Sequence, residues 1–301
     1  MVTRATLKHD GCLWEYFFFR TSPGIMHRTL LLAFLLLYAA TTWALKPSRE
    51  WVATPDSLGL KYQTVALTTS DHAQLAGWVV EPAPNVPDQH TTMVMAYGDM
   101  NNMSHFLHQA QALSKGGYRV YMFDYRGFGH SSDFAIDRQR LYYPEFATDL
   151  RTALADARHR YPRSRTGIIG FSMGTIMGSE VAASGKCDFL IAEGYVASPQ
   201  LLVAGIFQRS QKVVTLPVEA ADYALVARRV NCPWLLVGGT ADKNMPLADS
   251  VTVARAARWR QRRQVLSFEG GHLEGFHRLT EAEYGDKYVR ELSRFLAGRQ
   301  N

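Results

Sequence analysis

The sequence predicts an α/β fold in which a mostly parallel sheet is covered by helices on both faces. Three observations support this prediction. From about residue 92 onward, short apolar runs alternate with longer stretches of helical periodicity. The apolar runs are continuous, which is typical of strands buried on both faces. The 256 residues that follow position 45 contain no Pro-, Gly- or Ser-rich linker, so we expect them to form one domain.

The expected elements follow one another in order along the chain. We expect strands at 62–68, 75–82, 92–97, 119–123, 166–171, 189–192, 234–237 and 265–268. The first two strands flank Ser70, Asp71 and His72 and are expected to form a β-hairpin. We expect helices at 102–113, 146–161, 173–183, 247–258 and 281–296.

The composition excludes several classes of protein. With 47% hydrophobic and 20% charged residues, the chain can bury a core and is not disordered as a whole. Three cysteines without a C-x-x-C pair offer neither a disulfide scaffold nor a structural zinc site. Residues 46–301 carry 29 basic and 25 acidic side chains, an excess too small to indicate a nucleic-acid partner. The basic run at 255–263 is interpreted as the solvated end of a helix, with contact to an anionic membrane as the alternative.

The 17 residues from Thr29 to Leu45 carry no formal charge. At ~1.5 Å per residue they would form ~25 Å of helix, somewhat less than the ~30 Å hydrocarbon core of a bilayer. The basic residues before this run and Trp43 near its end favour a membrane anchor with an extracytoplasmic body. A chain that starts at Met26 would instead have a cleaved signal peptide and would be secreted or periplasmic. A buried core helix is the third alternative.

We therefore divide the chain into three parts. Residues 1–25 are an N-terminal extension to which we assign no role. Residues 26–45 are the anchor or signal peptide, and residues 46–301 are the folded domain.

Ligands of open α/β sheets lie at the carboxyl ends of the strands, so the residues after each strand are candidates for chemistry. The strand at 166–171 ends in the sequence Gly-Phe-Ser-Met-Gly, with the serine at position 172, and a helix follows. In such a sharp strand-to-helix turn the serine has a strained backbone and an exposed hydroxyl, and only glycines fit two positions to either side. The pattern predicts that Ser172 is a nucleophile, with a glycine-rich packing turn as the alternative.

A serine hydroxyl needs a base that is oriented by an acid, and in this type of sheet the chain order is Ser, Asp or Glu, His. Two later strands run into loops that carry Asp242 and His272, which we predict to be the acid and the base. A helix cap is the alternative role for Asp242, and a surface position is the alternative for His272. His277 is a competing base, and Asp286 and Glu269 are weaker candidates for the acid.

An oxyanion hole needs two backbone N–H donors. We predict the amide of Met173, directly after the nucleophile, and the amide of Asp99, in the loop after the strand at 92–97, with Met100 as the alternate. A carboxylate aimed at a developing oxyanion would oppose catalysis. We therefore expect the side chain of Asp99 to cap the following helix and turn away from the site.

These motifs, in this order, resemble the α/β-hydrolase superfamily, in particular its serine aminopeptidase-like and small-cap esterase-like members. The resemblance spans roughly residues 60–298. It rests on Tyr-Gly at 97–98 where the family usually has His-Gly, on residues 124–131, on the Gly-Phe-Ser-Met-Gly turn, on the acid loop at 238–246 and on Gly-His at 271–272. The resemblance implies an eight-stranded, mostly parallel sheet and a triad of Ser172, Asp242 and His272. Residues 124–131 are interpreted as a structural turn beside the site.

The sequence thus predicts a serine hydrolase that cleaves a carboxylic ester or amide by acyl transfer and needs no cofactor and no metal. The segment at about 198–229 lies where the family inserts its cap. Its apolar residues favour acyl chains or aromatic acids over charged peptides, and a lipid-like ester or amide is among the candidate substrates. Ordinary packing against the sheet is the alternative. A peptidase of the same fold is one alternative function. A catalytically silent, membrane-tethered binding protein is the other.

Two smaller groups of residues complete the candidates. Cys187 and Cys232 precede two successive strands that we expect to be neighbours. The two cysteines could therefore form a disulfide, and a pair of buried thiols is the alternative. His105 and His108 share a helix face but lack a carboxylate at ligand spacing. We interpret these two histidines as packing or surface residues rather than as metal ligands.

Overall fold

The computed structural model describes residues 44–298. The expected N-terminal extension at 1–25 and all but the last two residues of the apolar segment at 26–45 lie outside these residues. Within the described part of the chain, no helix is both long and apolar enough to cross a bilayer. Ala44 and Leu45 donate their backbone N–H groups to the carbonyl of Arg138, and Leu45 is fully buried. The end of the charge-free run is therefore part of the folded domain.

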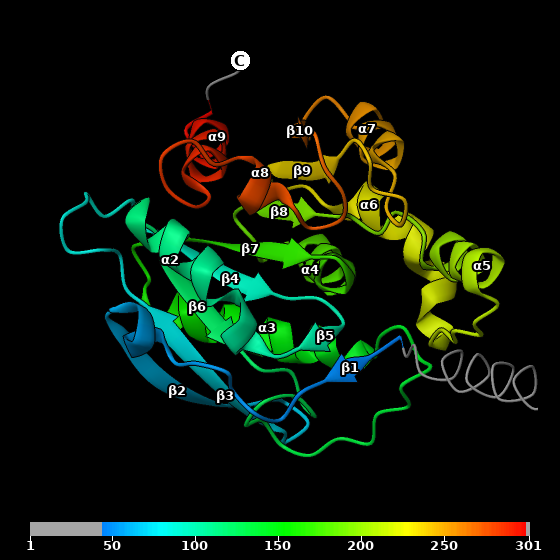
Figure 1. Cartoon of the computed structure of the whole chain (residues 1–301), viewed down its shortest axis with the longest axis horizontal. Helices are drawn as coiled ribbons and strands as arrows, with labels where there is room; N and C mark the ends of the chain where they lie inside the picture. The colour runs from blue at the N-terminus through cyan, green and yellow to red at the C-terminus, as the bar shows by residue number, and fades with distance from the viewer. Residues whose placement is uncertain (1–43, 299–301) are drawn as a thin grey trace, which may run out of the picture. The chain divides into compact units, whose positions relative to one another are not determined.

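Eight strands form one mixed sheet, in the spatial order β10-β9-β8-β7-β4-β6-β3-β2 (Figure 1). β2 pairs antiparallel with β3, β3 pairs antiparallel with β6, and all other neighbours are parallel. The predicted hairpin and the mostly parallel eight-stranded sheet are confirmed. The strands are β2 (Tyr62–Thr68), β3 (Gln74–Val80), β4 (Thr91–Ala96), β6 (Arg119–Phe123), β7 (Arg165–Phe171), β8 (Leu190–Glu193), β9 (Trp234–Gly239) and β10 (Arg263–Phe268). A separate two-residue pair joins β1 (Lys46–Pro47) to β5 (Met100–Asn101).

Helices lie on both faces of the sheet (Figure 1). α3 (Pro144–Arg160) packs against α4 (Met173–Ala183), and α4 also contacts α6 (Val226–Arg229). α2 (Leu107–Lys115) and α9 (Asp286–Leu296) contact each other. The remaining helices are α5 (Pro199–Ser210), α7 (Leu247–Arg255), α8 (Gly275–Arg278) and the 3-10 helices η1 (Pro55–Leu58), η2 (Met103–Phe106) and η3 (Val218–Leu225). The central strands between these layers are buried along their whole length, so the carboxyl ends of the strands are held rigidly.

The last helix begins at Asp286 and not at 281 as the periodicity predicted. Gly285, just before it, has a φ of 72°, in the left-handed region. The Asp286 carboxylate accepts hydrogen bonds from the amides of Glu281 and Ala282. These contacts fold residues 281–285 into a turn, so the first helical turn cannot form there.

The basic run at 255–263 also differs from the prediction. α7 ends at Arg255, three residues earlier than expected, and the run continues as a loop into β10. The last two arginines of the run are half-buried: Arg262 donates to the carbonyl of Phe295 at 2.6 Å and Arg263 to that of Val253 at 2.8 Å. These two arginines are therefore structural contacts and not part of a free charged surface.

Candidate active site

Ser172 lies in the tight turn between β7 and α4. Its φ of 51° and ψ of −121° are a strained conformation for a residue with a side chain. A side chain on Gly170 would place its Cβ 2.9 Å from the carbonyl oxygen of Gly174, and one on Gly174 would meet the carbonyl oxygen of Ala96 at 1.9 Å. The two glycines are thus required by the close approach of neighbouring backbone, and the turn presents Ser172 at the end of the sheet.

The loops after β9 and β10 are tied to each other. The amide of Thr240 donates to the carbonyl of Phe268, and that of Ala241 to the carbonyl of Gly270, both at 2.9 Å. Gly239 is needed at this crossing, because a Cβ there would lie 2.4 Å from the same Gly270 carbonyl oxygen. These loops carry Asp242 and His272, so this crossing fixes the two side chains relative to each other.

The structure brings Ser172, His272 and Asp242 into one hydrogen-bonded chain. His272 Nε2 lies 2.9 Å from Ser172 Oγ, and His272 Nδ1 lies 2.7 Å from Asp242 Oδ2. A carboxylate can only accept, so Nδ1 carries the proton in the neutral imidazole and Nε2 accepts from the serine hydroxyl. This geometry allows His272 to remove a proton from Ser172 while Asp242 holds the ring in orientation.

The Asp242 carboxylate is held ionised. The carboxyl is buried, which opposes ionisation, but the hydrogen bond from His272 and the amides of Met245 and Asn244 outweigh this effect, and the pKa of Asp242 is lowered. Both amides donate to Oδ1 at 2.9 Å, which leaves Oδ2 for the imidazole. The negative charge therefore stands where it can stabilise a protonated His272.

The two expected oxyanion-hole residues lie beside the serine. Met173 is the first residue of α4, so its amide has no acceptor within the helix. The loop after β4 passes next to the serine, since a Cβ on Gly98 would be 3.5 Å from Ser172 Cβ. Asp99 follows Gly98, and its carbonyl accepts from the amide of Lys46 at 2.8 Å. The loop that carries Asp99 therefore passes beside Ser172, which Met173 directly follows in the chain.

The expectation that Asp99 caps the following helix is wrong. Asn102 is the cap of η2, and its side chain accepts from the amide of Ser104. The carboxyl of Asp99 instead lies within electrostatic range of His272 and Lys46. Burial raises the pKa of Asp99, although a hydrogen bond from its own backbone amide and the fields of His272 and Lys46 favour the ionised form.

Tyr97, which stands where the family usually has histidine, has a clear structural contact. Its ring is fully buried, and its hydroxyl donates to Asp124 Oδ1 at 3.3 Å and accepts from the amide of Tyr125 at 3.1 Å. Asp124 also accepts from the amide of Met103 at 2.9 Å. Tyr97 therefore ties the loop that follows β4 to the loop that follows β6.

The competing candidates lie away from this hydrogen-bonded chain. His277 belongs to α8 and is exposed, and Glu269 is exposed as well. Asp286 accepts hydrogen bonds from the amides of Glu281 and Ala282, in the turn before α9. Sequence reasoning missed Glu193, a buried carboxyl at the end of β8 next to the serine and histidine loops. An acidic residue that closes an otherwise apolar strand is the signal that could have identified it.

The segment at 198–229 contains α5, η3 and α6, as expected for a small cap. Five of its large apolar side chains are exposed: Leu201, Phe207, Val213, Val218 and Leu225. A cavity of about 280 Å³ lies between α5 and the loop that carries Asp242, and it is lined in part by Leu201, Leu202 and Met245. Of the five exposed side chains only Leu201 lines this cavity, whose wall also contains the charged residues Arg209, Lys243 and Asp249.

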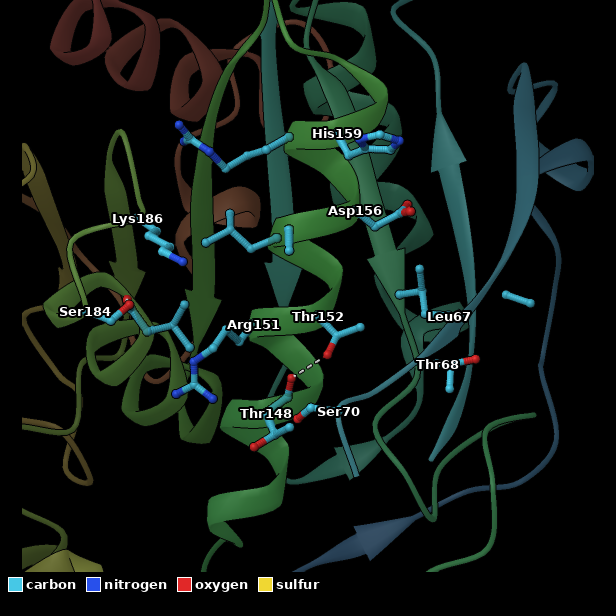
Figure 2. A pocket seen from close by; sticks show the side chains of 15 residues that line it. Leu67, Thr68, Ser70, Thr148, Arg151, Thr152, Asp156, His159, Ser184 and Lys186 are labelled. Atoms are coloured by element: carbon cyan, nitrogen blue, oxygen red, sulfur yellow. Dashed lines mark hydrogen bonds between the residues drawn. The ribbon is translucent and has the colours of Figure 1, made fainter. Parts of the chain in front are cut away.

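A second cavity, of about 750 Å³, is separate from this site. It lies between β2, α3 and α4, and Figure 2 shows Arg151, Thr152 and His159 of α3 along one wall. Ser172, His272 and Asp242 are not among its lining residues. Among residues 44–298, no group of three or more His, Cys, Asp or Glu side chains could hold a metal ion.

Comparison with known proteins agrees with this architecture. A protein-family profile described as "Serine aminopeptidase, S33" matches residues 87–218, a span that includes Ser172 and ends before Asp242 and His272. The chain is 25% identical to an "Uncharacterized protein YfhR" of Escherichia coli (strain K12) over 245 residues, 79% of this chain and 82% of that protein. It is 21% identical to an "Uncharacterized membrane protein YNL320W" of Saccharomyces cerevisiae over 210 residues, 68% of this chain and 71% of that one.

Among solved structures, the fold is similar to that of the esterase Pf2001 of Pyrococcus furiosus. The TM-score is 0.66, the identity is 18%, and the match covers 85% of this chain and all of the other. At this level of identity the likeness is one of fold.

Proposed function

Because this chain belongs to the α/β-hydrolase superfamily, we propose that it is a serine hydrolase that cleaves a carboxylic ester or amide through an acyl-enzyme. The observation that carries the proposal is the hydrogen-bonded chain from Ser172 Oγ through His272 to Asp242, with contacts of 2.9 and 2.7 Å. The strained backbone of Ser172 at the start of a helix supports the same role. A peptidase would use the same chemistry.

In the proposed mechanism Ser172 Oγ attacks the substrate carbonyl carbon while His272 Nε2 takes the hydroxyl proton. The carbonyl oxygen becomes an oxyanion and accepts hydrogen bonds from the amides of Met173 and Asp99. The imidazolium then gives its proton to the leaving alcohol or amine, and an acyl-serine remains. A water molecule, deprotonated by His272, releases the acid and restores Ser172. Asp242 stays ionised throughout and stabilises the imidazolium.

The exposed apolar side chains of the cap support an apolar, lipid-like acyl group as the substrate. A hydrophobic wall stabilises a bound chain by about 0.8 kcal/mol for each methylene that leaves water. Because Leu201 also lines the cavity beside the Asp242 loop, the acyl chain would run from Ser172 toward α5. We therefore expect kcat/KM to rise with acyl length in a panel of p-nitrophenyl esters.

We further propose that residues 46–301 function outside the cytoplasm and that the apolar segment at 26–45 takes them there. The charge-free run and the basic residues before it support this location. The name of the yeast relative, a membrane protein, supports only an association with a membrane. The mass of the mature protein distinguishes a retained membrane anchor from a cleaved signal peptide, because cleavage removes the apolar segment. Protease added to intact cells or spheroplasts should digest the domain, and a protected domain would contradict the location.

The test of the activity is labelling by a fluorophosphonate, which reacts with activated serines. The parent protein should be labelled and should hydrolyse short acyl esters. Ser172→Ala should abolish labelling and nearly all turnover with an unchanged circular dichroism spectrum. Ser179→Ala serves as the matched control, since Ser179 lies in the same helix and its hydroxyl donates to the carbonyl of Ile176. A folded parent that is neither labelled nor active would favour the silent binding protein.

A further inference from the structure

Glu193 contacts both the nucleophile and the histidine loop. It is the last residue of β8 and is 1% exposed. Its backbone carbonyl accepts from the amide of Ser172 at 3.0 Å, and its Oε1 accepts from the amide of Gly275 at 2.8 Å. Gly275 follows His272 by three residues. One residue therefore links the turn that carries the serine to the loop that carries the base.

The packing around this link leaves little room for movement. A Cβ on Gly275 would lie 2.6 Å from Glu193 Oε1, and a Cβ on Gly194 would lie 2.7 Å from His272 Cε1. Leu273 has a φ of 57°, which is unusual for a branched side chain, so the loop is held in a strained conformation. The hydrogen bond from Gly275 to Glu193 anchors this loop to the sheet, together with the ring contact between Phe276 and Phe171 of β7.

The surroundings of the Glu193 carboxyl contain few charges. His272 and Asp242 face it from the loops after β10 and β9, and the phenols of Tyr284 and Tyr288 face it from the segment before α9 and from α9 itself. Oε2 has no hydrogen-bond partner within residues 44–298. Burial raises the pKa of Glu193 to about 7, although the amide of Gly275, the phenol of Tyr288 and the field of His272 favour the ionised form. The group therefore changes its charge in the neutral range.

We propose that Glu193 is a positioning residue for His272, which fixes the loop of the base through Gly275 and adds a second negative charge that stabilises the imidazolium. This inference rests on the proposed serine hydrolase function. The two contributions can be separated, because glutamine keeps an oxygen acceptor for Gly275 and removes only the charge. Alanine removes both.

The experiment compares pH–rate profiles of kcat and kcat/KM for the parent, Glu193→Gln and Glu193→Ala. In Glu193→Gln the imidazolium loses the negative charge of the ionised fraction of Glu193, so the acidic limb of the profile should move to lower pH. The maximal kcat should fall only about three- to tenfold, because His272 stays in place. Glu193→Ala should lose on the order of 100-fold in kcat, since displacement of a catalytic group by about 1 Å has this effect.

Glu180→Gln is the matched control. Glu180 lies on α4, and burial raises its pKa to about 7 as well, but the charges around it are those of Arg151, Glu219 and Arg229. Its replacement should leave the acidic limb unchanged. An unshifted limb in Glu193→Gln, or the same shift in both variants, would overturn the role of Glu193. Circular dichroism shows whether Glu193→Ala folds. If the alanine variant does not fold, the comparison of the parent with Glu193→Gln is sufficient for the test.

A second measurement is independent of turnover. The Cε1–H signal of His272, assigned by its loss in His272→Gln, is followed by NMR across the pH range. Its titration should occur at lower pH in Glu193→Gln than in the parent. If the parent is inactive, the proposed function fails, while this titration still decides whether Glu193 acts on His272. An unchanged titration would overturn the inference even in an active enzyme.

Discussion

The hydroxyl of Tyr97 donates to Asp124 and at the same time accepts from the amide of Tyr125. These contacts join the ends of β4 and β6, which are neighbours in the sheet. Asp99 lies two residues after Tyr97, so the same contacts hold the loop that is proposed to supply an oxyanion-hole amide. The substitution of tyrosine for the usual histidine therefore leaves this loop anchored.

Removal of the Tyr97 hydroxyl should lower both stability and activity. Tyr97→Phe leaves the amide of Tyr125 without its acceptor in a buried position, which costs about 1–3 kcal/mol. For a domain of this size, Tm should fall by roughly 2–4 °C per kcal/mol. Because the Asp99 loop loses one anchor, kcat should fall by more than KM changes. Urea denaturation and ester hydrolysis measure the two effects.

Tyr142→Phe is the control for this variant. Tyr142 is also fully buried, but its hydroxyl has no hydrogen-bond partner within the described residues. Its removal should change stability by less than about 1 kcal/mol, since no paired group is lost. Equal losses in the two variants would contradict the anchoring role of Tyr97.

The sheet and the three side chains of the hydrogen-bonded chain could be predicted because they depend on local patterns and on topology. Ser172, Asp242 and His272 each follow a strand, and parallel strands end at the same edge of a sheet. The pairings of Tyr97 with Asp124 and of Glu193 with Gly275 could not be predicted. They depend on side chains from distant segments that approach within 3.3 Å, and no periodicity records such contacts.

The predictions that Asp99 caps a helix and that the last helix begins at residue 281 were wrong for a related reason. A cap depends on which of several nearby polar side chains reaches the first amides, and Asn102 does so instead of Asp99. At 281–296 the helical pattern extends beyond the helix, and the Asp286 carboxylate captures the preceding amides. In both cases competition between local hydrogen bonds decided the outcome.

Replacement of a glycine in the serine turn should destabilise the protein much more than replacement of a glycine one helical turn further along α4. Gly174→Ala places a Cβ 1.9 Å from the carbonyl oxygen of Ala96, a contact that backbone atoms cannot relieve. We expect no soluble protein, or a loss of more than about 3 kcal/mol. In Gly178→Ala the nearest atom is Ile168 Cγ2, at 3.3 Å.

Gly178→Ala should therefore stay within about 1 kcal/mol of the parent, because the gain in helix propensity offsets the tight contact. The yield of soluble protein and chemical denaturation compare the two variants. A stable and active Gly174→Ala protein would mean that β4 and α4 do not approach as closely as described.

The stability of the domain should fall as the pH rises from about 5 to about 7. Burial raises the pKa of Glu193 from its ordinary value of 4.5 to about 7. Between these values the unfolded chain has released the proton while the folded chain keeps it. The folded state then binds more protons, so the free energy of unfolding decreases with increasing pH. For Glu193 this loss amounts to about 3 kcal/mol, and it is complete above about pH 7.

Glu193→Gln removes the titrating group, so the difference in unfolding free energy between pH 5 and pH 8 should shrink by about 3 kcal/mol. Urea denaturation at both pH values measures this difference. Glu50→Gln, at an exposed position near the start of the described residues, should leave the difference unchanged. The same pH dependence in the parent and in Glu193→Gln would show that folding does not raise the pKa of Glu193.

The two cysteines of the described region are unpaired but adjacent. Cys187 is buried, Cys232 is partly buried, and their thiols are close enough to hydrogen-bond to each other. They precede β8 and β9, which pair in register from Leu190 and Trp234. We expect diamide to convert them into one intramolecular disulfide, detected as a loss of two free thiols after denaturation.

This disulfide would close a loop of 45 residues, which corresponds to about 4 kcal/mol of stabilisation in the chain-entropy model. Tm should therefore rise on oxidation and return with reductant, and Cys232→Ser should show neither change. The third cysteine, Cys12, is replaced by serine in all samples so that it cannot exchange with the pair. If the domain is exported as proposed, protein isolated under thiol-blocking conditions should already carry the bridge, since disulfides persist in oxidising compartments. Fully reduced thiols in that sample would argue against an extracytoplasmic location.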